Sequence, residues 1–360
     1  MQICANWIEI FEHPEYFESG TEELPSSGRQ QWTLWGEIVK SAGIQEIAER
    51  AGVSMSTVSR ALNHTGQISS QRAAEIFRIA NELGYAPRTA GRTIAVILPE
   101  SDIELRWYSI NLLNAIRLEA AERGRPLEIV SSDQLHILDE RSLAGMLSFD
   151  FGCQLAERVG RSNAVPLVCI NDSARHIDQV YSVFSDEDQA MSLAVGHLAG
   201  FGHRRIGLIL NGTLSDYSNN TRKTAFEREL ARFNLESREE FIVHPGDVRW
   251  KLHGSVRQLL DAGVTAVIST GESRSASVQN SLRYCGARVP EEVSLIGWEM
   301  AEVSEYLDPP QTTIGQDFPA LARCALNTLE CRIGGGQVGK DTLVPCRLNE
   351  RASVAMPPRN

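Results

Sequence analysis

The sequence predicts a small all-helical domain followed by a larger α/β domain built on parallel sheet. Between residues 44 and 83, apolar residues recur at helical spacing in three short segments, separated by glycine or polar turns. From Thr93 onward, short apolar runs alternate with amphipathic segments, which is typical of strands joined by crossover helices. A length of 360 residues is sufficient for one small and one larger domain.

The first two helices are predicted between Ile44 and Leu62. One apolar face recurs at i, i+3, i+4 and i+7 and consists of Ile44, Ile47, Ala48 and Ala51. Gly52 can adopt the positive φ of a sharp turn, and the hydroxyl of Ser54 can cap the next helix. Two short helices joined in this way form the helix-turn-helix pattern, whose second helix reads the DNA major groove.

A third helix is predicted from Ser69 or Ser70 to Leu83. Its apolar face closes a three-helix core and consists of Ala73, Ile76, Phe77, Ala80 and Leu83. Gly84 ends this helix, and Pro87 prevents the helix from continuing. The strands of the α/β domain are expected at Ile94–Leu98, Leu127–Val130, Leu167–Ile170, Ile206–Leu210, Ala266–Ser269 and Ser294–Ile296.

Composition excludes several classes of protein. The net charge of −11 argues against a general nucleic-acid coat, but residues 44–92 carry a net charge of +2, as phosphate contact requires. The seven scattered cysteines lack any C-x-x-C motif, which indicates reduced thiols in a cytosol. We see no apolar run of membrane length and no export signal, and therefore expect a cytoplasmic protein.

The run from Ala51 to Asn63 reads A-G-V-S-x-x-T-V-S-R-x-L-N and resembles the DNA-binding headpiece of the LacI/GalR (lac repressor) family of bacterial transcription regulators. Further family landmarks follow in order, namely 165–168, Val183 with Asp186, 197–206, 289–297 and 309–316. The resemblance covers residues 44 to 355. It implies a periplasmic-binding-protein-like domain of two doubly wound parallel-sheet subdomains, with strand crossings near Val183, Ile314 and 336–341 and a ligand in the cleft between them.

We accordingly divide the chain into three parts. Residues 1–43 form an N-terminal extension of unknown role, which we expect to be dispensable for DNA binding. Residues 44–92 form the helix-turn-helix headpiece, and residues 93–356 form the effector-binding and dimerisation domain. The family's Ala-Arg-x-Leu hinge helix, whose leucines wedge into the minor groove, is missing between Ala86 and Arg92. We therefore expect operator binding that is weaker or more tolerant of half-site spacing than is usual in the family.

The candidate DNA-binding residues lie on and beside the second helix. Arg60 is predicted to contact a base or a phosphate, the alternative being a solvated helix arginine. Met55 and Ser56 occupy the positions that read bases in relatives, although Met55 could instead fill the small core. Ser54, Thr57 and Ser59 are expected to hold phosphates or cap the helix. Asn63 and Arg88 complete the predicted set.

The candidate effector-binding residues follow from the family resemblance. Arg222, in R-K-T-A-F, matches the family's R-x-x-G-F, whose arginine forks onto sugar hydroxyls; the alternative is a surface ion pair. In the family, aspartates at two strand ends accept hydrogen bonds from sugars. Here they are replaced by Glu272, in Gly271-Glu272, and by Glu299, in Trp298-Glu299. Both acids are longer by one methylene, which suggests a reshaped pocket. Trp298 is expected either to stack on a sugar ring or to pack in the core. Tyr108 and Asn211 are the remaining candidates.

These features predict a sequence-specific transcription regulator, most simply a repressor, that binds a double-stranded DNA operator as a homodimer and responds to a carbohydrate-like effector. In the family, the dimer interface uses the helix after the first strand of the effector domain and a helix near 275–282. No catalytic motif, cofactor motif or metal-ligand spacing is present, so we expect neither an enzyme nor a metal site. Two alternatives stay open: a constitutive regulator with a degenerate cleft, and a pure sugar-binding receptor.

Overall fold

The computed structural model describes residues 43–62, 68–69, 72, 75–76, 78–80, 83, 93–99, 107–140, 143–149, 152–161, 165–173, 177, 180–211, 217–246 and 249–358. The predictions that concern residues 1–42 of the extension, Asn63, Arg88 and the shortened hinge lie outside these residues.

The helix-turn-helix is present as predicted. Helix α1 (Ile44–Ala51) ends at Gly52, whose φ of 61° is left-handed, and α2 (Met55–Leu62) follows. The hydroxyl of Ser54 accepts a hydrogen bond from the backbone N–H of Thr57 at 3.2 Å, which is the expected N-cap. Described residues between 72 and 80 are helical and contribute three buried side chains to the headpiece core, those of Ile76, Ile79 and Ala80.

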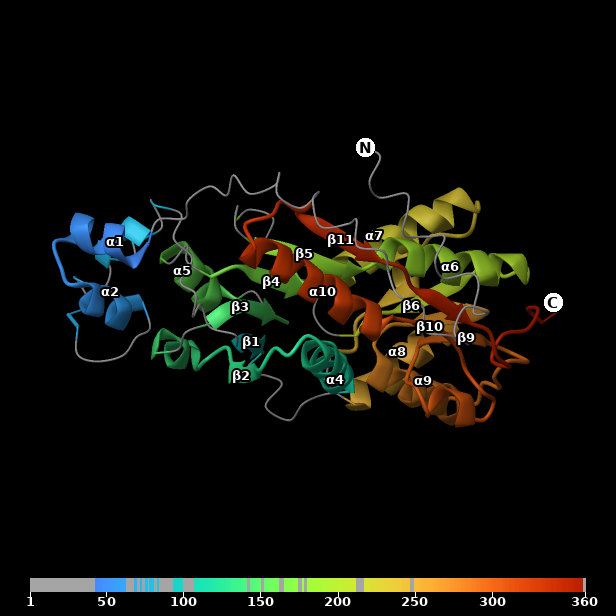
Figure 1. Cartoon of the computed structure of the whole chain (residues 1–360). Helices are drawn as coiled ribbons and strands as arrows, with labels where there is room; N and C mark the ends of the chain where they lie inside the picture. Colours follow the sequence, from blue (N-terminus) through green and yellow to red (C-terminus); the bar gives the residue numbers. More distant parts are fainter. Residues whose placement is uncertain are drawn as a thin grey trace, which may run out of the picture.

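The first sheet of the α/β domain is parallel throughout, in the order β11-β5-β4-β3-β1-β2. Its strands are β1 (Thr93–Leu98), β2 (Leu127–Ser131), β3 (Leu143–Ser148), β4 (Leu167–Ile170), β5 (Val180–Ser185) and β11 (Asp341–Val344). The associated helices are α4 (Trp107–Glu122), α5 (Cys153–Arg161) and α10 (Phe318–Ile333), with a 3₁₀ turn at Leu135–Glu140. In Figure 1, α10 (red) lies against the green strands of this sheet, although it comes late in the sequence.

The second sheet has the order β12-β10-β9-β8-β6-β7, with only β12 antiparallel among its described strands. Its strands are β6 (Ile206–Ile209), β7 (Ile242–Val243), β8 (Ala266–Ser269), β9 (Ser294–Trp298), β10 (Thr312–Gly315) and β12 (Arg347–Asn349). The helices are α6 (Glu187–Gly200), α7 (Tyr217–Arg232), α8 (Arg249–Asp261) and α9 (Glu272–Tyr284), with 3₁₀ turns at Glu239–Phe241 and Ser304–Tyr306. The two sheets form the two doubly wound subdomains that the sequence predicted.

Within the described chain, three segments cross between the sheets. The first follows β5 and leads into α6, and the second follows β10 and leads into α10, so the crossings predicted near Val183 and Ile314 are confirmed. The third crossing was placed wrongly at 336–341. The chain stays beside the first sheet there because it must still form β11, and it crosses at Pro345–Cys346, just before β12.

A buried histidine makes the stability of the second subdomain depend on pH. His203 is 1% exposed; its Nε2 donates to the carbonyl of Ala355 at 2.8 Å, and its Nδ1 lies 2.9 Å from the hydroxyl of Thr265. Desolvation by burial lowers the pKa of His203, although the bond to Ala355 opposes the shift. The neutral ring is therefore favoured by folding.

We expect the free energy of unfolding to fall as the pH drops from 7.5 to 5.5. Because the pKa of His203 is lower in the folded state, its neutral ring stabilises the fold at pH values above the unfolded pKa of about 6.5. This contribution is lost as the pH falls through the pKa of the folded state. Urea unfolding at both pH values measures this loss, and the loss should be smaller in His203→Gln, which cannot titrate. An identical loss in the two proteins would contradict the assignment.

Candidate DNA-binding helix and ligand site

Helix α2 presents a polar face away from the headpiece core. Val58, Ala61 and Leu62 are buried, whereas Met55 is 56% exposed and therefore does not fill the core. The other predicted reading residues, Ser56 and Arg60, are also exposed.

The hydroxyls at the start of α2 bond to one another. Ser54 Oγ lies 2.8 Å from both Ser56 Oγ and Thr57 Oγ1, and Arg60 Nε donates to the carbonyl of Ser56 at 3.2 Å. Ser59 and Thr57 are partly buried beside them. The face thus combines exposed hydroxyls, a thioether and a guanidinium, which suits contacts with phosphates, thymine methyls and guanine edges.

A chain of polar contacts joins the ends of strands in the two subdomains, and we call it the crossover network. Its members are Tyr108, Asn171, Ser185, Glu187, Arg222 and Gln316. In the first subdomain, Asn171 Nδ2 donates to the Tyr108 hydroxyl at 2.7 Å, and the backbone N–H of Ser185 donates to Asn171 Oδ1 at 2.6 Å. Gln316 Nε2, just after β10, donates to Ser185 Oγ at 2.8 Å and to Glu187 Oε1 at 3.3 Å.

The network ends in a buried ion pair. Arg222 Nε and Nη2 donate to the two carboxylate oxygens of Glu187, each at 2.7 Å, and the residues are 8% and 3% exposed. Such bidentate geometry is the strongest arrangement for an arginine and a carboxylate. The Arg222 guanidinium also lies over the ring of Trp298, with Cζ 4.7 Å from the ring centroid. Of the two readings that the sequence left open for Arg222, the structure shows an ion pair, but a buried one.

Trp298 and Glu299 occupy different environments from those a sugar contact would need. Trp298 is fully buried in the core of the second subdomain, so its packing role is the one that the structure shows. The Glu299 carboxylate pairs with Arg351 at 2.9 Å and also accepts from Asn349 and Thr313. Although desolvation opposes the shift, these hydrogen bonds lower the pKa of Glu299.

Asn211 follows β6 and is packed against Gly271, where an added Cβ would lie 3.1 Å from the Asn211 Cβ. Its backbone N–H donates to Thr270 Oγ1 at 3.1 Å. Its side-chain oxygen and nitrogen are buried and have no hydrogen-bond partner among the described residues. Glu272 begins α9, but its side chain lies outside the described part of the chain.

The structure thus brings Tyr108 and Arg222 into one network and places Trp298 beside it, whereas Glu299 belongs to a separate cluster. Sequence reasoning missed Asn171, Ser185, Glu187 and Gln316 as network members. A signal was present for two of them, because Gln316 ends the P-P-Q-T-T-I-G-Q landmark and Glu187 follows the landmark Asp186.

The described residues contain no group of three or more His, Cys, Asp or Glu side chains placed to hold a metal ion. Nor does this part of the chain include a helix with the length and hydropathy needed to cross a membrane.

Comparison with known proteins identifies the headpiece. Residues 43–88 match the family described as bacterial regulatory proteins, lacI family. The chain belongs to this family. Residues 195–354 of this lacI-family regulator match the periplasmic binding protein-like domain. As a family member it is a DNA-binding transcription regulator.

The similarity to curated lacI-family proteins is low but extends over most of the chain. The HTH-type transcriptional repressor CytR of Escherichia coli K12 is 28% identical over 343 residues, which cover 87% of this chain and 96% of that protein. The HTH-type transcriptional repressor PurR of Aliivibrio salmonicida is 25% identical over 314 residues, which cover 81% and 92%.

Solved structures share the fold of this lacI-family chain. The transcriptional regulator CelR in complex with cellobiose has a TM-score of 0.66 at 24% identity, covering 87% of this chain and 99% of that one. The lac repressor dimer bound to operator has a TM-score of 0.65 at 23% identity, covering 88% and 100%. Both confirm the combination of headpiece and two-sheet domain.

Proposed function

We propose that the chain represses transcription as a homodimer, with α2 reading the operator and a carbohydrate-like effector binding at the crossover network. The observation that carries the proposal is the union of two parts in one chain. One is a recognition helix with an exposed polar face, and the other is a two-subdomain fold whose connecting segments meet in a buried polar network. CelR, a structural neighbour, is described in complex with cellobiose.

Coupling between the two parts follows from the position of the network. Gln316 contacts Ser185, which ends β5, and Glu187, which begins α6, so two of the crossing segments touch one another there. A ligand that alters these contacts would change the angle between the subdomains. Effector and operator would then alter each other's affinity by a coupling free energy of about 1–3 kcal/mol.

Arg60→Ala tests the DNA-binding role. An operator is first selected from random duplex DNA with the full-length chain. We expect the substitution to weaken operator binding by about 1–3 kcal/mol, because Arg60 is exposed on α2 and arginine is the commonest partner of guanine. Fluorescence anisotropy at fixed salt measures the affinity.

Arg50→Ala, on the exposed side of α1, is the matched control and should have a smaller effect. Unchanged affinity in Arg60→Ala would refute the proposal.

Thermal shifts with a panel of neutral sugars and sugar acids test the effector-binding role. A ligand present at about a hundred times its Kd should stabilise the protein by about 2.7 kcal/mol. If operator binding is intact and no ligand shifts the transition, the regulator is constitutive.

The proposed dimer interface is an exposed apolar face on α4 and β2. Ile110 and Ile129 are 48% and 56% exposed and line a groove of about 500 Å³ together with Leu113 and Leu127. Leu118, also on α4, is 51% exposed. Exposed apolar patches of this kind mark protein–protein interfaces. The occupant that we propose is a second copy of this chain, since the lac repressor, which shares the fold, is described as a dimer on its operator.

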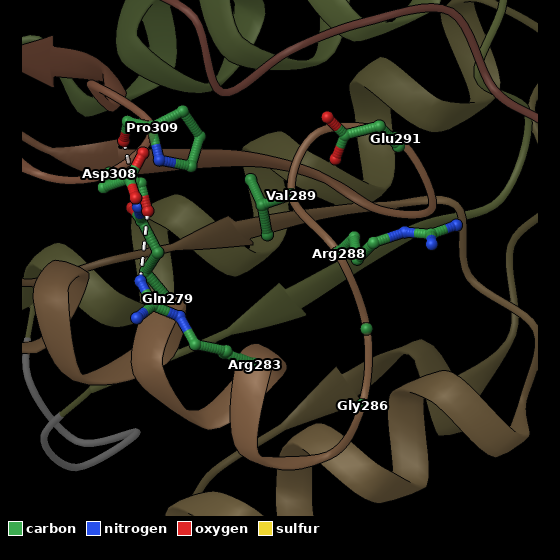
Figure 2. A pocket seen from close by; sticks show the side chains of 9 residues that line it. Gln279, Arg283, Gly286, Arg288, Val289, Glu291, Asp308 and Pro309 are labelled. Carbon is green, nitrogen blue, oxygen red and sulfur yellow. Dashed lines mark hydrogen bonds between the residues drawn. The ribbon is translucent and has the colours of Figure 1, made fainter.

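The helix near 275–282 that the family resemblance places in the dimer interface is α9, and it contacts α4. A groove of about 280 Å³ lies between α9 and the loops that follow it, and Figure 2 shows the side chains that line it. Gln279 Nε2 donates to the carbonyl of Pro309 at 2.9 Å, and Arg283 donates to that of Asp308 at 3.2 Å, so α9 holds the 308–309 loop in place. Tyr284, at the end of α9, is 78% exposed, and its ring centroid lies 4.7 Å from that of the His253 ring.

Leu118→Asp with Ile129→Asp should convert the dimer into a monomer, because two charges placed in an apolar interface remain unpaired on association. Sedimentation velocity measures the oligomeric state, and operator affinity should fall in parallel. Leu343→Asp is the matched control, because Leu343 is 57% exposed on the edge strand β11. A double variant that sediments like the wild type would exclude this interface.

A further inference from the structure

The arginine fork of the crossover network is already occupied by a carboxylate of the same chain. We infer that Glu187 acts as a built-in ligand of Arg222, which makes the site selective for uncharged, hydroxyl-bearing effectors and excludes anionic ones. This inference rests on the proposed role of the network as the effector site, and it goes beyond that role by assigning the charge class of the ligand and the residue that sets it.

The geometry leaves no place for a second carboxylate on the bonded edge of Arg222. Nε and Nη2 each donate to a different oxygen of Glu187 at 2.7 Å, and the Glu187 and Arg222 side chains are only 2% and 10% exposed. An anionic ligand would have to displace Glu187 from this pair. The displaced Glu187 carboxylate would then stay buried without its counter-ion. Among the described residues, the uncharged amide of Gln316 would remain as its hydrogen-bond donor.

The other acid near the end of β9 is also neutralised. Glu299 accepts from Arg351 with both of its carboxylate oxygens, at 2.9 and 3.1 Å, and from Asn349 at 2.9 Å. Arg351 in turn donates to the carbonyl of Gln311 at 2.7 Å. Glu187 with Arg222 and Glu299 with Arg351 therefore form two neutral pairs at this edge of the second sheet.

What remains at the same edge is a set of neutral polar atoms without partners among the described residues. The side-chain amide of Asn211 lies after β6, and Gln316 Oε1 lies after β10. Leaving such groups unsatisfied is unfavourable. They comprise both donors and acceptors. A ligand hydroxyl both donates and accepts, so a polyhydroxyl ligand matches this set, whereas a carboxylate or phosphate, which only accepts, does not.

Chemical rescue tests the inference. Glu187→Ala removes the internal carboxylate and should lower the thermal transition. Acetate should then bind beside Arg222 and raise the transition of this variant, with sodium chloride at the same concentration as the ionic-strength reference. We expect acetate to bind the variant at least roughly tenfold more tightly than the wild type, a difference of about 1.4 kcal/mol. The double variant Glu187→Ala/Arg222→Ala should show no such preference for acetate over chloride.

Glu299→Ala is the matched control, because it also removes a carboxylate from a guanidinium but leaves Arg351 bonded to Gln311 and Thr313. Its acetate response should be small. The inference is overturned if acetate fails to rescue Glu187→Ala, or if glucuronate or glucose 6-phosphate stabilises the wild type in an Arg222-dependent way. Operator affinity of the wild type, measured separately, tests the proposed function independently of either outcome.

Discussion

Ile47→Ala is expected to abolish operator binding while leaving the thermal transition of the α/β domain unchanged. Ile47 is fully buried in the headpiece core, whose other buried described members are all aliphatic: Ala48, Val58, Ala61, Leu62, Ile76, Ile79 and Ala80. Truncating a buried isoleucine costs about 2–5 kcal/mol. A domain of the headpiece's size has a total stability of about 2–7 kcal/mol, so the unfolded headpiece becomes a major species.

Two measurements separate loss of folding from loss of contact. Differential scanning calorimetry should retain the main transition, and anisotropy should show no specific operator binding. Met55→Ala is the control, because Met55 is exposed on α2 and its truncation leaves no cavity in the core. Retention of operator affinity in Ile47→Ala would mean that the three-helix core does not hold the recognition helix in place.

The headpiece could be predicted from the sequence because its determinants are local. Gly52 supplies the left-handed turn and Ser54 supplies the cap, and both act within a few residues of their own positions. Most of the strands read from apolar runs were also predictable, because they are buried on both faces of a parallel sheet; the edge strand β2, with Ile129 56% exposed, is the exception.

Strands whose composition is set by distant packing were not predicted. Strand β3 contains Gly145. A Cβ added there would lie 2.7 Å from the side chain of Leu329 on α10, so the close packing of α10 on β3 requires a glycine. This glycine interrupts the apolar run from which a strand is predicted. Strands β11 and β12 are largely exposed and lack apolar runs. The misplaced third crossing has the same origin, because β11 was not recognised before it.

The candidate site shows the same division between local and long-range information. Arg222 was recognised from its own motif, but its partner Glu187 is 35 residues away, and only the packing of α6 against α7 brings them together. The two readings of Trp298 were likewise indistinguishable in sequence, since a tryptophan at the end of a strand can face a ligand or the core. Its burial, below a guanidinium, is a property of the tertiary structure.

Arg222→Ala is expected to lower the free energy of unfolding by about 3–5 kcal/mol, because it leaves the buried Glu187 carboxylate without its counter-ion. Urea unfolding measures the change. Arg228→Ala is the matched control on the same helix. Arg228 is half exposed and pairs with Asp188, and the buried Glu229 keeps its ion pair with Arg232 in this variant. The free energy of unfolding should therefore fall by only about 0–1 kcal/mol.

The double variant Glu187→Leu/Arg222→Met shows whether the pair serves stability or ligand selection. Replacing both charges of a buried pair with apolar residues of similar volume is often neutral or stabilising by about 1–4 kcal/mol, so this variant should recover the stability that Arg222→Ala loses. If it does, the ion pair is not needed to hold the subdomain together. A stable double variant that no longer responds to neutral sugars would then assign the pair to the ligand site, whereas one as unstable as Arg222→Ala would make the pair a structural requirement of the fold.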